Sequence, residues 1–184
     1  MDFPYFLLQC LWLMVPGIFA NMAPVLTKGI FKWMALPVDM GKKWKGRRIL
    51  GDHKTLRGFV MGILFSIIIV YFQKLLYAYP AFQKLSFIDY GAESALWVGF
   101  LIGFGVLFGD AVESFIKRRL DVKPGQSFFP WDQLDAAFGG VLFVTLFLGL
   151  SLWIMVTVVV MAPVLHIAIR HVAFWLGITK SKWD

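Results

Sequence analysis

Charged residues, cysteine and histidine are all scarce in this sequence. Only 16% of the 184 residues are charged and 59% are hydrophobic, whereas an ordinary soluble domain has about 25% charged and about 45–50% apolar residues. This composition excludes a typical soluble domain, and it excludes a disordered chain, because disorder requires low hydrophobicity. The single cysteine, Cys10, excludes an internal disulfide framework and a cysteine-based metal cluster, and the three histidines lack the spacing of a zinc site.

Long uncharged runs predict an all-α, polytopic membrane protein with about five transmembrane helices in one domain, residues 1–184. A helix needs about 20 apolar residues to cross a bilayer, and the expected spans lie near 3–26, 59–79, 93–113, 136–158 and 162–178. The first is expected to be a retained span rather than a signal peptide, because Asp2 and no Lys or Arg precede it.

The last two spans come from one uncharged run, 136–169. As a single helix this run would be about 50 Å long, against a hydrocarbon core of about 30 Å. We expect the break at Ala162-Pro163, because proline disrupts a helix interior and is favoured at a helix start.

The basic residues predict the orientation of the chain. The net charge is +7, and nine Lys or Arg residues lie in the loop 27–58. The loop 114–135 and the tail, with Lys180 and Lys182, are also basic, whereas the loop 74–92 carries only Lys74 and Lys84. With five spans, the loops 27–58 and 114–135 and the tail are cytoplasmic and the N-terminus is outside; a four-span alternative would put the tail outside. Because the basic loops flank membrane spans, their charge indicates the cytoplasmic membrane face, and no nucleic-acid partner is expected.

Four carboxylates lie at the two ends of the second basic loop. Asp110 and Glu113 are three residues apart at the end of the third span, and Asp132 and Asp135 are three apart at the start of the fourth. Carboxylates at a membrane rim are costly unless paired or metal-bound, and such oxygen ligands suit Mg²⁺. Asp132 alone would also suit a helix start, but Asp110 and Glu113 lie where the helix dipole disfavours negative charge.

Basic residues between and before these pairs are candidate phosphate ligands. Lys117, Arg118, Arg119 and Lys123 form either a phosphate clamp or a membrane-flanking cluster. In the first loop, residues 51–58 include glycines, basic residues and a threonine, which can expose backbone N–H groups to phosphate, although the Walker A spacing is absent. Attraction to anionic lipid explains residues 42–48 equally well.

Two polar positions inside spans stay open at this point. Asn21 lies near the inner end of the first span, either at a helix break with Pro24 or in the lining of a polar pocket. Arg170, beside His166 and His171, is equally suited to a structural partner and to a substrate phosphate.

Several of these motifs resemble one enzyme family. The stretch 109–118 (GDAVESFIKR), followed by KPG at 123–125 and FPWDQLD at 129–135, resembles the CDP-archaeol synthases, as do ANMAP at 20–24 and GDHKTLRG at 51–58. A more distant similarity links Ser114, Lys117, Arg118, Lys123, Asp132 and Asp135 to the phosphatidate cytidylyltransferases. The chain departs from that second pattern, because Pro124 replaces an expected Asp and Gln133 an expected Arg.

The resemblance implies a multi-pass enzyme of the cell membrane with its active site on the cytoplasmic face. It implies CTP and 2,3-bis-(O-geranylgeranyl)glycerol 1-phosphate as substrates, a CDP-lipid and pyrophosphate as products, and Mg²⁺ as cofactor. Asp132 and Asp135 are the expected first metal ligands, and Asp110 and Glu113 either complete the metal site or orient its ligands from outside. These four residues with Lys117 form the expected catalytic set. The expected substrate-binding residues are Asn21, Gly51, Asp52, Lys54, Thr55, Arg57, Ser114, Arg118 and Lys123.

A rival hypothesis from another class is a small cation transporter or channel that uses the four carboxylates. It predicts carboxylates near mid-span, whereas the sequence places them at one rim. A non-enzymatic membrane scaffold with basic lipid-binding loops is a second rival, and it leaves the acidic pairs unexplained.

Overall fold

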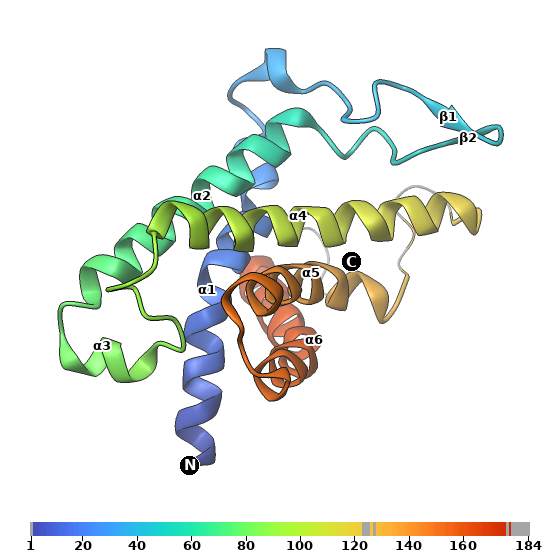
Figure 1. The fold of residues 1–184 in the computed structure, drawn as a ribbon. Helices are drawn as coiled ribbons and strands as arrows, with labels where there is room; N and C mark the ends of the chain where they lie inside the picture. The colour runs from blue at the N-terminus through green and yellow to red at the C-terminus, as the bar shows by residue number, and fades with distance from the viewer. Residues whose placement is uncertain (1, 123–125, 127, 176, 178–184) are drawn as a thin grey trace.

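The protein is described here from a computed structural model, which describes residues 2–122, 126, 128–175 and 177. Its elements are α1 (Phe3–Leu26), η1 (Lys32–Met34), β1 (Lys43–Trp44), β2 (Arg47–Arg48), α2 (Leu56–Leu76), α3 (Pro80–Leu85), α4 (Ala95–Arg119), α5 (Trp131–Leu148) and α6 (Leu152–Trp175) (Figure 1). Within the described part of the chain, five helices (α1, α2, α4, α5 and α6) are long and apolar enough to cross a membrane. The prediction of an all-α polytopic protein with about five spans is confirmed.

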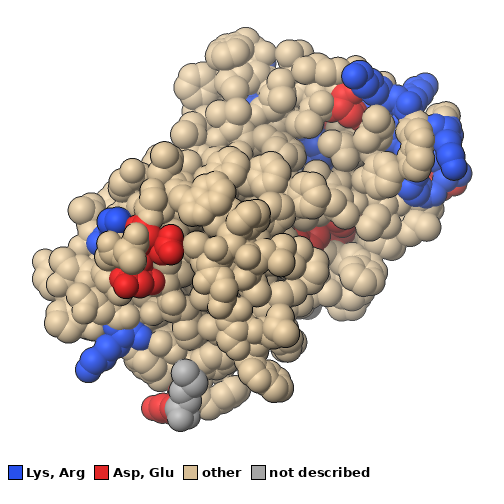
Figure 2. Space-filling view, viewed as in Figure 1, with Lys and Arg blue, Asp and Glu red and all other residues tan. Residues whose placement is uncertain are grey.

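The helix α4 lies at the centre of the bundle. It packs against α2 and α5, while α1 packs mainly on α2 and α6 on α5. The buried core follows α4 through Val98, Leu101, Ile102 and Val106. Charged side chains gather at two ends of the visible face, and the band between them is mostly uncharged (Figure 2). This distribution suits a protein that crosses a bilayer.

The predicted break at Ala162-Pro163 is wrong. The helix α5 ends at Leu148, the turn is formed by Gly149, Leu150 and Ser151, and Pro163 lies inside α6. Gly149 adopts φ +69° and its N–H reaches the Thr145 carbonyl at 3.0 Å, which ends the helix as a left-handed glycine commonly does. A proline is tolerated within a membrane helix, because its neighbours satisfy the freed backbone group.

Other helix bounds differ from the prediction in ways that matter for the site. α2 begins at Leu56 rather than near 59, because Thr55 caps it with a hydrogen bond from the Gly58 N–H at 3.2 Å. α4 runs on to Arg119 and α5 already begins at Trp131, so the second basic loop is shorter than the predicted 114–135. Much of the predicted loop is therefore helical, and its charged side chains have fixed directions. The short helix α3 was not predicted.

Both basic loops lie at the same end of the molecule. The β1–β2 hairpin crosses beside the C-terminal end of α4, whereas α1 begins at the opposite end (Figure 1). Arg47 in the hairpin pairs with Asp121, which follows α4. The loop 27–55 therefore lies beside the C-terminal end of α4 and beside Asp121, which follows it.

Candidate active site

Close contact between α4 and α5 positions the acidic residues. A Cβ atom added to Gly109 would lie 2.1 Å from the Asp135 carbonyl oxygen, and one added to Gly139 would lie 2.2 Å from that of Gly105. Real side chains do not approach a backbone so closely, so only glycine permits this helix separation. The contact sets Asp110, one residue after Gly109, directly beside the first turns of α5.

Three carboxylates meet at this contact. One oxygen from each of Asp110, Glu113 and Asp135 can be chosen so that all three lie within 4.8 Å of one another. Glu113 is buried, and the other two are half-buried. We call these three residues the carboxylate triad. Like charges held this close in a poorly solvated place repel one another and favour a cation between them.

Two lysines contact the triad from different sides. The Lys54 Nζ lies 2.5 Å from Asp110 Oδ1, and the Lys117 Nζ lies 2.7 Å from Glu113 Oε1. Lys117 also lies 2.6 Å from Asp132 Oδ1. Lys54 comes from the first basic loop and Lys117 from α4, so the triad links the two parts of the chain that the sequence analysis singled out.

Asp132 lies outside the triad. Its Oδ1 forms the ion pair with Lys117, and its Oδ2 accepts a hydrogen bond from the Phe128 N–H at 2.8 Å. Asp132 and Asp135 are three residues apart, yet in the first turn of α5 Asp132 turns toward the preceding loop. The structure thus groups three of the four predicted metal ligands, and Asp132 lies next to this group, in contact with Glu113 and Lys117.

A polar cavity of about 460 Å³ opens beside the triad. Its lining comes from the first basic loop and from the end of α4, with Val122 just beyond. The lining residues are Arg47, Arg48, Leu50, Gly51, Asp52, His53, Lys54, Glu113, Ser114, Lys117, Arg118, Asp121 and Val122. Five of them are lysine or arginine, so the cavity suits a polyanion. Gly51, Asp52, Lys54, Ser114 and Arg118, which were all predicted to bind substrate, line this one cavity.

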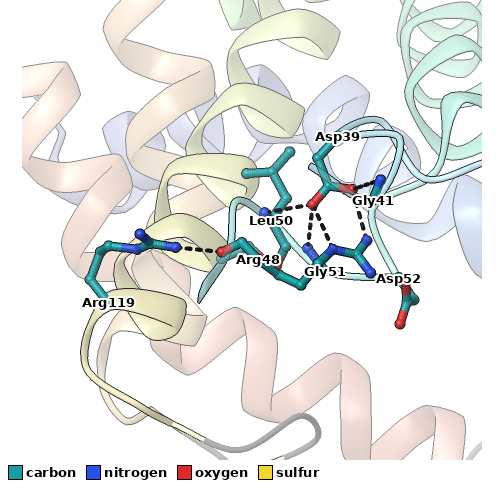
Figure 3. A network of polar contacts seen from close by, with 8 residues as sticks. Asp39, Gly41, Arg48, Leu50, Gly51, Asp52 and Arg119 are labelled. Carbon is teal, nitrogen blue, oxygen red and sulfur yellow. Dashed lines mark hydrogen bonds and ion pairs between the residues drawn. The ribbon is translucent and has the colours of Figure 1, made fainter. Parts of the chain in front are cut away.

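A buried carboxylate fixes the conformation of the loop that lines one side of this cavity. The Asp39 side chain is 1% exposed and accepts hydrogen bonds from Arg48 and from the N–H groups of Gly41, Leu50 and Gly51 (Figure 3). Desolvation alone would raise the pKa of Asp39, but these donors outweigh it and hold that pKa well below its usual range. Arg48 also reaches the exposed Asp52 at 2.8 Å.

The hairpin is tied to α4 by arginines. Arg119 donates to the carbonyls of Trp44 and Arg48 and lies over the rings of Trp44 and Phe115. Ser114 donates to the Leu50 carbonyl at 2.9 Å, so its hydroxyl fastens the loop to the helix. Loop and helix therefore form one wall of the polar cavity.

Two of the residues predicted to bind substrate, Thr55 and Arg57, have structural partners. Thr55 caps α2, as described above. Arg57 is buried and donates to the carbonyls of Lys28 and Ile30, which fixes the chain after α1. Lys123, also predicted to bind substrate, lies outside the described residues.

A second cavity, about 260 Å³ and largely apolar, lies among α1, α4, α5 and α6. Residues such as Leu13, Val106 and Val144 line most of it. Its polar lining residues are Asn21, Asp132, Gln133, His166 and Arg170. Asn21 thus lines a cavity, and α1 continues unbroken past it to Leu26. The Lys117–Asp132 ion pair joins the two cavities, because Lys117 lines the polar one and Asp132 the apolar one.

Sequence reasoning missed Asp39 and the glycine contact. The spacing of Gly105 and Gly109, four residues apart in an apolar helix, is a known signal for close helix packing. No comparable local pattern marks Asp39, since its donors lie 2 to 12 residues away and meet it only when the loop folds.

Comparison with known proteins identifies the family. The profile of the CarS-like CDP-archaeol synthases matches residues 3–183. The CDP-archaeol synthase of Thermococcus gammatolerans is 35% identical over 175 residues, which cover 94% of each chain. That of Pyrobaculum islandicum is 34% identical over 184 residues, 100% of each chain. A solved structure, of an intramembrane enzyme for archaeal membrane lipids biosynthesis, covers 86% of this chain and 90% of its own at a TM-score of 0.69 and 30% identity. This multi-pass membrane protein therefore belongs to the CDP-archaeol synthase family of nucleotidyltransferases.

Proposed function

We propose that the protein transfers the cytidylyl group of CTP to the phosphate of 2,3-bis-(O-geranylgeranyl)glycerol 1-phosphate, forming the CDP-lipid and releasing pyrophosphate. The observation that carries this proposal is the position of the carboxylate triad, next to a cation-lined cavity and joined through Lys117 to an apolar one. The polar cavity suits a nucleoside triphosphate, and the apolar cavity suits an isoprenoid lipid. The names of the relatives point to the same product class.

The triad fits Mg²⁺ as the cofactor. Its donors are all carboxylate oxygens, which Mg²⁺ prefers, and three of them within 4.8 Å leave room for shared coordination with waters and phosphates. We propose Asp110, Glu113 and Asp135 as the metal ligands, with Asp132 holding Lys117. When bound, the ion would neutralise charge on the triphosphate as the leaving group departs.

The basic lining of the polar cavity would hold the triphosphate. Lys54 and Lys117 already contact triad carboxylates, so phosphate oxygens shared with the ion would lie within their reach. Arg118 lines the same cavity, and its planar fork suits phosphate. Fixed charges of this kind contribute most to catalysis where little covalent chemistry is required.

The lipid phosphate is the nucleophile. One of its oxygens forms a bond to the α-phosphorus of CTP, the bond from that phosphorus to the bridging oxygen of the β-phosphate breaks, and pyrophosphate leaves with the electron pair. The nucleophile is already an anion, so no side chain has to remove a proton. This agrees with a polar site built from carboxylates, lysines and arginines.

We also propose that the active site faces the cytoplasm, with the N-terminus outside. The two basic loops lie at the same end of the bundle, and basic loops beside membrane spans favour the cytoplasmic side. Labelling of single cysteines placed in the hairpin, in sealed vesicles of known orientation, tests this topology.

A conversion assay tests the function. Purified protein is given CTP labelled in the α-phosphate together with ether-linked isoprenoid or ester-linked acyl glycerol phosphates, with Mg²⁺ or with a chelator. We expect label in the ether lipid, an equal amount of pyrophosphate, and loss of both on chelation. Label in no lipid would remove the enzymatic proposal, and equal use of the ester lipid would remove the ether-lipid substrate.

A further inference from the structure

We propose that Arg170 in α6 binds the phosphate of the lipid substrate at the polar end of the apolar cavity. This inference rests on the function proposed above and deepens it, because it assigns one side chain to the acceptor phosphate. The sequence analysis left a structural partner and a substrate phosphate equally open for this residue.

The first support is the missing protein partner of Arg170. It lies in the last candidate span, where an arginine is costly unless it is paired. Among the described residues it forms no ion pair with a carboxylate, and its Nε is buried without a hydrogen-bond partner. The Nε atoms of Arg57 and Arg119 are also buried without a partner, but the terminal nitrogens of these arginines donate to backbone carbonyls. Among the described residues, Arg170 has no such acceptor and no carboxylate like the one that Arg48 pairs with. The anion that compensates Arg170 is therefore expected to come from a ligand.

The second support is the place of Arg170 in the apolar cavity. Most of the lining is aliphatic, and the polar side chains include Asn21, Gln133 and His166 beside Arg170. An apolar cavity with a cationic side chain in its lining matches a lipid with an anionic head group. The planar guanidinium can donate two parallel hydrogen bonds to a phosphate.

The third support is the connection to the reacting centre. Asp132 lines the same cavity as Arg170, and its ion pair with Lys117 leads to Glu113 of the triad. A phosphate bound at this end would therefore lie next to the site where the nucleotide reacts. The cavity volume, about 260 Å³, is below the range of about 300–1,000 Å³ for drug-sized ligands. The head group and the start of a chain fit inside, and the rest of both chains extends into the bilayer.

Kinetics of Arg170→Gln and Arg170→Lys test the assignment. Loss of a hydrogen bond to a charged group predicts a rise of about 10- to 150-fold in the KM for the lipid phosphate with Arg170→Gln, and a smaller rise with Arg170→Lys. The KM for CTP should stay within about twofold in both. His171→Ala is the matched control, because the His171 ring hydrogen-bonds the Ile167 carbonyl of its own helix and does not line the cavity. It should leave both KM values unchanged.

Binding without CTP separates this inference from the proposed function. Native mass spectrometry compares the lipid phosphate, the same lipid with a free hydroxyl, and inorganic phosphate. We expect the wild type and His171→Ala to prefer the lipid phosphate, and Arg170→Gln to bind both lipids equally. A wild type that forms no CDP-lipid but keeps this Arg170-dependent preference would refute the function and support the site.

Three results would overturn the inference while the function stands. These are an unchanged lipid KM in Arg170→Gln, a rise in the KM for CTP instead, and binding of inorganic phosphate as tight as that of the lipid phosphate. If Arg170→Gln fails to fold, Arg170→Lys decides, because it keeps the charge and changes only the fork geometry. An unchanged lipid KM in that variant also overturns the inference.

Discussion

Replacing Gly109 by alanine perturbs the active site without touching a charged group. The new Cβ would lie 2.1 Å from the Asp135 carbonyl oxygen, and real contacts of this kind begin near 3.0 Å, so α4 and α5 must separate. Overpacking of this size costs about 1–3 kcal/mol of stability. The shift also acts on the carboxylate triad, because Asp110 follows Gly109 and Asp135 carries the contacted carbonyl.

The same displacement is expected to lower the catalytic rate as well as the stability. Displacement of reacting groups by about 1 Å can cost about 100-fold in rate, so Gly109→Ala should reduce kcat at least tenfold at a temperature where the protein stays folded. The assay is the labelled-CTP conversion, with thermal melting in the same detergent.

Two matched controls separate the site from the fold. Gly29→Ala should change neither quantity, because no atom lies within 4 Å of the new Cβ. Gly99→Ala meets the Ile67 Cα at 2.5 Å, away from the triad, and should lower stability more than kcat. Full activity in Gly109→Ala, or equal losses of kcat in Gly99→Ala and Gly109→Ala, would refute the argument that this helix contact sets the triad.

Three further predictions follow from named contacts. Asp135→Asn should lower the Mg²⁺-dependent rate about 100-fold or more and weaken Mn²⁺ binding measured by electron paramagnetic resonance. The control Asp2→Asn changes an exposed residue without a capping bond and should alter neither quantity. Retained Mn²⁺ binding in Asp135→Asn would exclude Asp135 as a ligand. The donors around Asp39 hold its pKa below the unfolded value of about 3.9, so the stability that the Asp39 carboxylate adds to the fold is present above that value and is lost as the pH falls through the folded pKa. The difference in melting temperature between wild type and Asp39→Asn should therefore shrink below about pH 4. A difference independent of pH would contradict this account. Gly149→Val should cost about 1–2 kcal/mol, because φ +69° is left-handed, whereas Pro163→Ala should be neutral or stabilising in chemical unfolding; the reverse order would place the helix break at Pro163.

The membrane architecture was largely predictable, because span formation depends on local composition. Uncharged runs in the sequence predicted the five long helices. The basic loops lie at one end of the molecule, as their charge predicted. The break between the last two helices was not predictable in the same way. Pro163 and Gly149 are both helix-breaking residues in one apolar run. Gly149 ends α5 in a left-handed conformation, whereas Pro163 is tolerated inside α6.

The chemistry of the site was predictable at the level of residue types, and its geometry only in part. Three residues of separation predicted that Asp132 and Asp135 share a face, and that rule holds within a regular helix. Asp132, however, lies in the first turn, where the loop offers the Phe128 N–H and α4 offers Lys117. Tertiary partners of this kind lie outside any local pattern, so the position of Asp132 outside the carboxylate triad could not be derived from spacing.

The balance of charge explains why the site combines residues from three parts of the chain, which are the first basic loop, α4 and α5. Counted as ionised, the triad and Asp132 carry four negative charges, and Lys54 and Lys117 supply two positive charges in direct contact. Two negative charges are left, and one divalent cation balances them without leaving a surplus to repel the triphosphate. Lys54 comes from the loop that Asp39 holds together internally and that Ser114 fastens to α4, so the loop wall contributes one of the two compensating charges. A loose loop would remove that charge together with the cavity lining, and for this reason the anchoring hydrogen bonds belong to the function as much as to the fold.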